Sequence, residues 1–148
     1  ADDAGNAGPD YKFGWGLLNT HKAAEFIDNE DKVILEDSIV DQTVREYRFY
    51  ASGDSGIRIT ICWTDPMGKV VEPSLNPTDI ILVNDLDIRL IKLNDSSVYE
   101  PFILTPETPD APAQTGDNFR DNIEQIYIPS SVLPLRLPAF QQHRKPPV

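Results

Sequence analysis

The sequence predicts a mainly β chain: an antiparallel, jelly-roll-like β-sandwich preceded by a short N-terminal helix. From Lys32 onward, apolar and polar residues alternate within short segments, which is the period of a half-buried strand. Clusters of Gly, Pro, Asn, Asp and Ser separate these segments at short intervals. A series of about six short strands with such turns is typical of a sandwich or a jelly roll.

The residues before this β region predict one short helix. Asn19 suits the N-cap position, and Thr20–Ile27 would follow as the helix. Its apolar residues, among them Phe26 and Ile27, do not form a long stripe along one face. Because so short a helix is marginal on its own, we expect it to need a partner on which to pack.

The alternating segments give the bounds of the main strands. These strands are predicted at Thr43–Ala51, Ile57–Trp63, Asp85–Leu93, Val98–Leu104 and Asn122–Ile128. The clearest is Ile57–Trp63, in which every second residue is large and apolar. The segments Glu72–Thr78 and Thr105–Asn118 contain prolines and are predicted to be loops.

Composition divides the chain into three parts. Residues 1–30 carry the helix, residues 31–130 form the predicted sandwich, and residues 131–148 are an atypical Pro-rich tail whose charged residues are all basic. We expect this tail to be poorly ordered beyond about Leu137. Removing Ala139–Val148 is therefore expected to leave stability nearly unchanged.

The charge balance excludes one class of partner and leaves others open. With 13 basic and 24 acidic residues in 148, the net charge is −11, so no Lys/Arg-rich face for nucleic acid is expected. The apolar runs are too short to span a membrane. Cys62 is the only cysteine, so no intrachain disulfide is possible, and its strand context predicts a small core residue. Because the chain starts at Ala1 and its one methionine is Met67, we expect that an upstream segment was removed.

The sequence predicts no catalytic machinery. The two histidines, His21 and His143, are both expected to be exposed surface residues rather than general bases. Acidic pairs such as Glu100 with Glu107, or Asp117 with Asp121, are expected by chance among 24 acidic residues and do not predict glycosidase geometry.

Two aspartates predict a calcium site. Asp85 and Asp87 are two residues apart on a strand, so both point to one face, where their charges repel unless a cation or donors offset them. Calcium is a hard cation that takes six to eight oxygens, and Asn84 and Asp65 could complete the set. In the competing interpretation these aspartates cap turns or lie on a solvated face. If calcium binds, it should raise the melting temperature, and a chelator should reverse the rise.

Two regions of the chain resemble the subtilases, the subtilisin-like serine peptidases. Gly8–Asn19, with its Gly-Trp-Gly turn, and the following Lys22-Ala23-Ala24 resemble the end of the catalytic domain and its final helix. Three later segments resemble the β-sandwich that follows the catalytic domain in a bacterial branch of the family. They are Ile59–Pro66 (containing Trp-Thr-Asp-Pro), Leu82–Ile88 (containing Val-Asn-Asp-Leu-Asp) and Asp121–Ile126.

The resemblance implies a non-catalytic C-terminal fragment of a secreted, extracellular serine endopeptidase. The Gly-Thr-Ser-Met motif that carries the subtilase nucleophile is absent, so the parent protein and not this chain would cleave peptides. The implied partners are the chain's own catalytic domain and a protein substrate, with a stabilising or substrate-positioning role.

The N-terminal region and the tryptophans leave two further possibilities open. Phe13, Trp15, Phe26 and Ile27 would lack their catalytic-domain partners, so they would fold back on the sandwich or promote self-association. The alternative function is an independent carbohydrate- or cell-surface-binding module. Exposed tryptophans would favour it, although Trp63 continues the inward face of its strand and is predicted to pack in the core.

Overall fold

The computed structural model describes residues 1–29, 33–51, 53–130 and 140–144, the last of these as backbone only. Within these ranges the chain is mainly β, with a single helix, α1, at Thr20–Asp28. The strands are β1 (Val44–Tyr47), β2 (Ile57–Cys62), β3 (Leu86–Ile91), β4 (Val98–Tyr99), β5 (Phe102–Ile103), β6 (Gln114–Thr115), β7 (Ile123–Ile128) and β8 (Phe140–Arg144). The predicted mainly β chain with antiparallel sheets and a short N-terminal helix is confirmed.

The chain forms two compact units. Unit 1 comprises Ala1–Ser38 together with Ile103–Gln114, and unit 2 comprises Ile39–Phe102 together with Thr115–Val148. The chain passes between the units at β5 and β6, which pair with each other as a two-stranded sheet.

Unit 1 contains α1 and the loops before it. Asn19 caps the helix as predicted, since its Oδ1 accepts a hydrogen bond from the Lys22 N–H at 2.9 Å. Asp10, only 2% exposed, accepts hydrogen bonds from the N–H groups of Asn6, Lys12 and Phe13 and so fixes the preceding turn. The segment from Ile103 joins this unit through Asp110, whose carboxylate lies 2.9 Å from the Lys12 Nζ. Among the described residues of this unit, local polar contacts rather than a buried apolar cluster therefore hold the loops and the helix.

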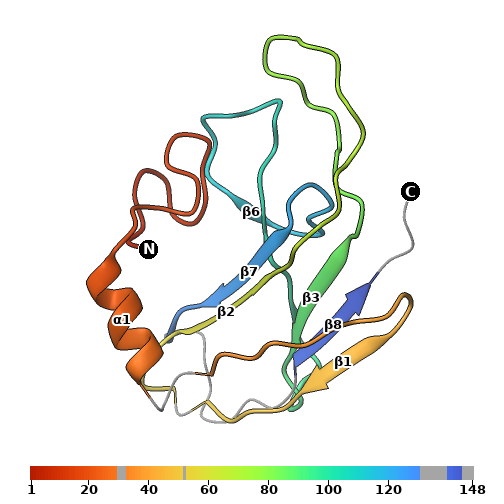
Figure 1. The fold of residues 1–148 in the computed structure, drawn as a ribbon. Coiled ribbons are helices and arrows are strands. Elements are labelled where there is room, and N and C mark those ends of the chain that lie inside the picture. Colours follow the sequence, from red (N-terminus) through yellow and green to blue (C-terminus); the bar gives the residue numbers. More distant parts are fainter. Residues whose placement is uncertain (30–32, 52, 131–139, 145–148) are drawn as a thin grey trace. The chain divides into compact units, whose positions relative to one another are not determined.

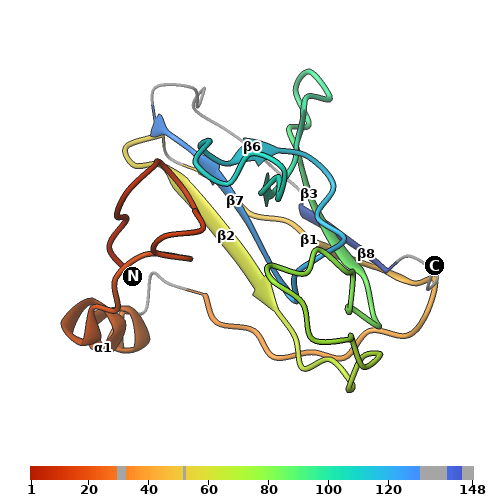
Figure 2. The ribbon, with the colours of Figure 1, turned by 90° about the horizontal axis from the view of Figure 1, so that it is seen from above.

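Unit 2 contains a four-stranded sheet in the order β1-β8-β3-β4 and a two-stranded sheet of β2 and β7. Every ladder that joins these strands is antiparallel. Figures 1 and 2 show β2 beside β7, and β8 beside β3, in both views. The six residues of β2 pair in order with those of β7, from Ile57 opposite Ile128 to Cys62 opposite Ile123.

The core of unit 2 is built from β3 and β7. Ile88 and Leu90 of β3 are fully buried, and Ile126 and Ile128 of β7 are at most 2% exposed. These four side chains alternate along their strands, so each strand turns one apolar face inward. The partly buried residues that pack against this cluster are Tyr47, Phe49, Ile59, Ile61 and Tyr99. The core therefore brings β3 and β7 together, although they belong to different sheets.

The structure differs from the predicted elements at three places. The expected strand Val98–Leu104 is interrupted between β4 and β5, where Pro101 has no N–H to donate. β6 lies within the predicted loop Thr105–Asn118. β8 lies in the tail that was expected to be poorly ordered, because β1 and β3 both use it as their pairing partner. The rest of that tail, 131–139 and 145–148, lies outside the described residues.

The prediction that Cys62 is a core residue is wrong. Its side chain is exposed. Along β2 the half-buried residues are Ile57, Ile59 and Ile61, and the residues between them are exposed. Cys62 directly follows Ile61, and adjacent residues of a strand point to opposite faces, so Cys62 lies on the outer face.

Candidate functional site

Asp65, one of the four predicted calcium ligands, is a hydrogen-bond acceptor for the backbone. Its Oδ2 accepts from the Val83 N–H at 2.7 Å, and its Oδ1 accepts from the Asn84 N–H at 2.9 Å and from the Asn84 Nδ2 at 2.8 Å. The Trp63 Nε1 donates to the Asn84 carbonyl oxygen at 3.0 Å, on the same short segment. Asp65 and Trp63 together fix the chain just before β3 begins.

Asp87, another predicted ligand, forms an ion pair with Arg89. The two side chains point to one face of β3 because they are two residues apart. Arg89 Nη2 lies 3.1 Å from Asp87 Oδ1 and 3.4 Å from Asp117 Oδ1, and Arg89 Nε lies 3.7 Å from Glu100 Oε1. The Asp87 side chain is 4% exposed and that of Arg89 is 19% exposed. One guanidinium therefore contacts three carboxylates: that of Asp87 is buried, whereas the Glu100 and Asp117 side chains are 45% and 42% exposed.

Glu124 of β7 is a buried carboxylate that the calcium prediction did not include. It is 0% exposed, and its Oε2 accepts a hydrogen bond from the Ile88 N–H of β3 at 2.7 Å. Its Oε1 is buried and has no hydrogen-bond partner among the described residues. The Glu124 side chain thus joins the two sheets of unit 2. Its carboxyl group accepts the Ile88 N–H, which would otherwise need the carbonyl oxygen of a neighbouring strand.

The surroundings of Glu124 raise its pKa to about 8 from the usual 4.5. Burial is the largest cause, because it disfavours the charged form. The nearby charges of Asp87 and Asp85 also raise the pKa, while the Ile88 N–H and the Arg89 guanidinium lower it. At neutral pH Glu124 is therefore mostly protonated.

Three of the four predicted calcium ligands, Asp65, Asn84 and Asp87, have polar partners within the fold. Among the described residues, no three His, Cys, Asp or Glu side chains are grouped so that they could hold a metal ion. Both oxygens of Asp65 already accept N–H donors, and Asp87 is paired with Arg89. Asn84 is held by Asp65, and Asp85 is half-buried at the start of the same strand region. Calcium binding by Asp85, Asp87, Asn84 and Asp65 stays a prediction.

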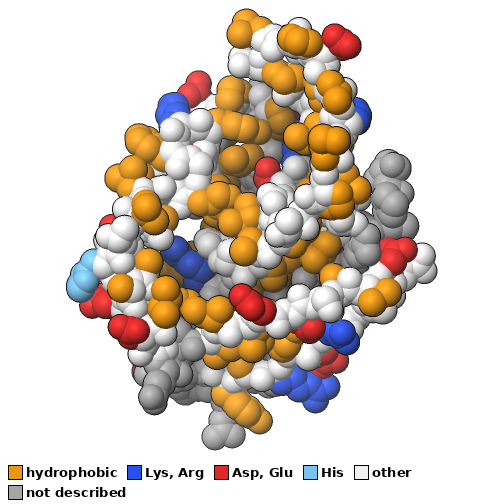
Figure 3. All heavy atoms as spheres, viewed as in Figure 1, with side chains coloured by type: hydrophobic (Ala, Val, Ile, Leu, Met, Phe, Trp, Pro, Cys, Tyr) orange, Lys and Arg blue, Asp and Glu red, His pale blue; other side chains and the backbone are white. Residues whose placement is uncertain are grey.

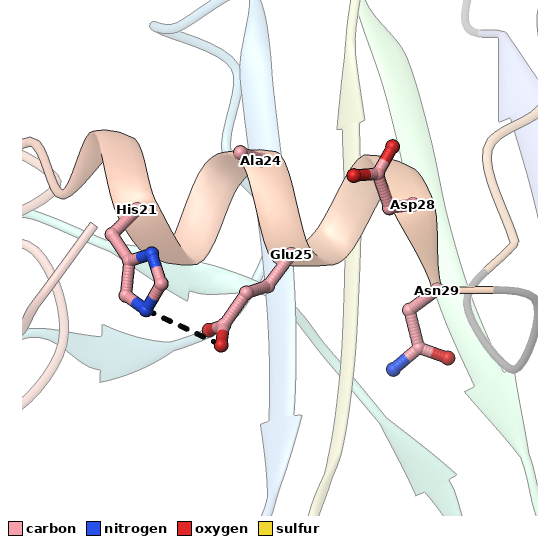
Figure 4. A pocket seen from close by; sticks show the side chains of 5 residues that line it. All are labelled: His21, Ala24, Glu25, Asp28 and Asn29. Carbon is pink, nitrogen blue, oxygen red and sulfur yellow. Dashed lines mark ion pairs between the residues drawn. The ribbon is translucent and has the colours of Figure 1, made fainter.

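His21 lies on the exposed surface of α1. Its Nε2 lies 3.3 Å from Glu25 Oε1 one turn along the helix, and the two side chains are 82% and 63% exposed. Both line an open, shallow depression together with Ala24, Asp28 and Asn29. Figure 4 shows His21 and Glu25 directed toward each other, whereas Asp28 points away from them. The side chain of His143, on β8, lies outside the described part of the chain.

No protein-family model, curated protein or solved structure matches this chain. Among the described residues, no helix has both the length and the apolar character needed to cross a membrane.

Arg89 and Glu124 are the two residues of this region that the sequence interpretation missed. Glu124 had a signal: it is two and four residues before Ile126 and Ile128, so the strand period places it on the same inward face. Arg89 had a weaker one, since it is two residues after Asp87 on the same predicted strand. Its contacts with Glu100 and Asp117 join segments that are distant in sequence and could not be read from local spacing.

Proposed function

We propose that this chain is a non-catalytic C-terminal part of a secreted subtilisin-like serine endopeptidase. In this role a jelly-roll-like β-sandwich stabilises the catalytic domain or helps to position large protein substrates. The observation that carries the proposal is that the three sequence segments that resemble the subtilase sandwich are hydrogen-bonded to one another. Trp63 of the first donates to Asn84 of the second, and the Trp63 N–H donates to the Asn122 carbonyl oxygen of the third at 3.1 Å.

The packing of unit 2 supports the sandwich part of the proposal. A sandwich buries one apolar face of each of two antiparallel sheets against the other. The inward residues of β3 and β7, which belong to different sheets, form one buried cluster, and Glu124 adds a hydrogen bond between the same two strands.

Exposed apolar residues in unit 1 support docking on another protein body. Helix α1 has no buried residue, and Phe26 and Ile27 are 45% and 70% exposed. Phe13 in the preceding loop is 46% exposed, while Trp15 is half-buried. Large apolar side chains in this number are costly to leave in water. The same surface would also drive self-association when the catalytic domain is absent.

The loop between β2 and β3 supports a role in contacting a substrate. Its base is closely packed, because a Cβ added to Gly68 would lie 2.1 Å from the Ile81 carbonyl oxygen. Three apolar side chains of the same loop, Met67, Val70 and Leu75, are 92%, 91% and 93% exposed. Hydrophobic side chains also occupy much of the face drawn in Figure 3. A braced loop that presents flexible and branched apolar side chains suits contact with varied protein segments.

The observed face of β2 and β7 gives less support to a carbohydrate-binding module. Sugar binding on a sheet favours a row of exposed aromatic rings. Among the described residues, the outward positions of these two strands carry one aromatic side chain, Tyr127, and the Arg58 guanidinium lies 5.2 Å from the centre of its ring. Trp63 is half-buried and uses its Nε1 within the fold.

The proposal can be tested on the reading frame that contains this chain. An upstream Asp, His and Ser set would be expected, and the full protein should keep its protease activity longer on heating than its catalytic part alone. The double substitution of Phe26 and Ile27 by serine should shorten that half-life, whereas the control Glu25→Gln should not. Equal half-lives with and without this chain would contradict the stabilising role, and a reading frame without such a set would contradict the parentage.

A further inference from the structure

The segment between α1 and β1 is exposed and has no regular secondary structure (Figure 1). Residues 33–40 form neither helix nor strand, and residues 33–38, which belong to unit 1, are all exposed. Val33, Ile34 and Leu35 follow one another there and are 73%, 60% and 61% exposed. Among the described residues, no hydrogen bond involves residues 33–36. Three consecutive apolar side chains are therefore exposed on a stretch of backbone that the described fold does not pair.

Such a segment has the form in which an endopeptidase binds its substrate. The enzyme takes a stretch of extended chain as an added strand, bonds its backbone groups and places alternate side chains in pockets. A segment within a helix or a ladder must first be unpaired. We propose that residues 33–36 are a processing site, cut after Leu35 by an endopeptidase whose primary pocket takes a large apolar side chain. Leu35 suits such a pocket better than Val33 or Ile34, because its side chain is not branched at Cβ.

The cut consumes one water molecule and breaks the peptide bond between Leu35 and Glu36. It leaves a new carboxylate on Leu35 and a new amino group on Glu36. All the strands of the described chain lie after this bond, and α1 lies before it. Processing would therefore separate the strands from the helix. This inference goes beyond the proposed function and does not depend on the parentage, because any endopeptidase with such a pocket can make the cut.

Exposed polar contacts link the start of the chain to the 103–114 segment of unit 1. The Lys12 Nζ lies 2.9 Å from Asp110 Oδ1, with the two side chains 62% and 85% exposed, and Asn6 Nδ2 donates to the Asp110 carbonyl oxygen at 3.1 Å. Ion pairs as exposed as this one contribute little to stability. The buried apolar side chains of the described chain are on β3 and β7, so none belongs to the N-terminal piece. We therefore expect that piece to dissociate after the cut.

The loop between β2 and β3 exposes its apolar side chains even more fully. Met67 and Leu75 are 92% and 93% exposed, against 61% for Leu35. This loop contains three prolines: Pro66, Pro73 and Pro77. Each proline lacks the N–H that an added strand would donate, and residues 33–38 contain no proline. Exposure alone thus predicts a cut in the loop, whereas an unpaired backbone with all its donors predicts a cut after Leu35.

The test is brief digestion of the whole chain with subtilisin, which cuts after large apolar residues, followed by mass spectrometry of the fragments. Within residues 1–130 we expect the first cut to produce one fragment that ends at Leu35 and one that starts at Glu36. The double variant Ile34→Ser with Leu35→Ser should slow this cut by about tenfold or more, because the primary pocket loses its apolar group. The matched control, Met67→Ser with Leu75→Ser, should leave the rate of the first cut unchanged.

Size-exclusion chromatography of the cut chain tests the separation. The fragment that starts at Glu36 should elute without the N-terminal piece and keep a β-type far-ultraviolet circular dichroism spectrum. A first cut anywhere else within residues 1–130 would overturn the proposal, and so would equal slowing by the two double variants. Fragments that elute together would overturn the expected separation of the strands from the helix.

Discussion

Replacing Glu124 by glutamine should remove a pH dependence of stability that this one carboxyl group creates. The pKa of Glu124 is about 8 in the folded chain, against a usual 4.5. Between these values the folded chain holds a proton that the unfolded chain has released, so stability falls as the pH rises. The contribution is therefore complete below pH 4.5, declines through the interval, and is gone above about pH 8.

The size of this effect follows from the two pKa values. Moving from 4.5 to about 8 corresponds to roughly 5 kcal/mol, at about 1.4 kcal/mol for each pH unit. Glu124 is 0% exposed, so solvent does not screen the contribution. A chain of this size is stable by only about 5–15 kcal/mol in total, and the decline should be easy to detect.

Urea unfolding followed by tryptophan fluorescence, repeated from about pH 5 to about pH 8, measures how much stability Glu124 contributes at each pH. We expect the unaltered chain to lose several kcal/mol over this range, and Glu124→Gln to lose much less, because the amide can still accept from the Ile88 N–H but does not ionise. Glu72→Gln, in the exposed loop before β3, is the matched control and should keep the full decline. Parallel profiles for Glu124→Gln and the unaltered chain would refute the reasoning.

Three further changes have defined outcomes. Cys62 is exposed, so in the folded chain it should react with an aromatic disulfide reagent almost as fast as in urea; strong protection would show that the outer face of β2 is covered. Asp65→Ala should lower the free energy of unfolding by about 2–3 kcal/mol, since three N–H donors lose their acceptor. Asp65→Asn should lower it less, and equal losses for the two variants would argue against the acceptor role. Deleting residues 140–148 should destabilise unit 2 by several kcal/mol in urea unfolding, because β8 lies between β1 and β3. Unchanged stability would contradict that pairing and support the prediction from the sequence that the tail does not contribute to stability.

The sequence predicted those strands that bury one face. β2 and β7 were located within a residue or so because their apolar residues recur at every second position, and this period exists only where one face is packed and the other is not. β8 has no such pattern and was missed. It forms because β1 and β3 both present backbone groups that need partners, which is a property of the assembled sheet and not of the segment itself.

The candidate site was predicted in part, since the residue types could be recognised from the sequence but their roles could not. Asp65 was expected to bind a cation, and the structure uses its oxygens to accept backbone N–H groups. A carboxylate serves equally well for either role, so its identity and position along the chain do not distinguish them. The difference depends on which donors the fold brings near, and for Asp65 these are 18 and 19 residues away.

Three carboxylates of unit 2 have their charge compensated in three different ways, and this makes a further prediction. Asp65 uses backbone N–H groups, Asp87 uses Arg89, and Glu124 keeps its proton. The last two are coupled, because Arg89 lowers the pKa of Glu124 while Asp87 raises it. Arg89→Gln should therefore raise the pKa of Glu124 above about 8, and the decline of stability measured in urea should extend to higher pH. A profile that keeps its original end point would show that Arg89 and Glu124 do not share one electrostatic site.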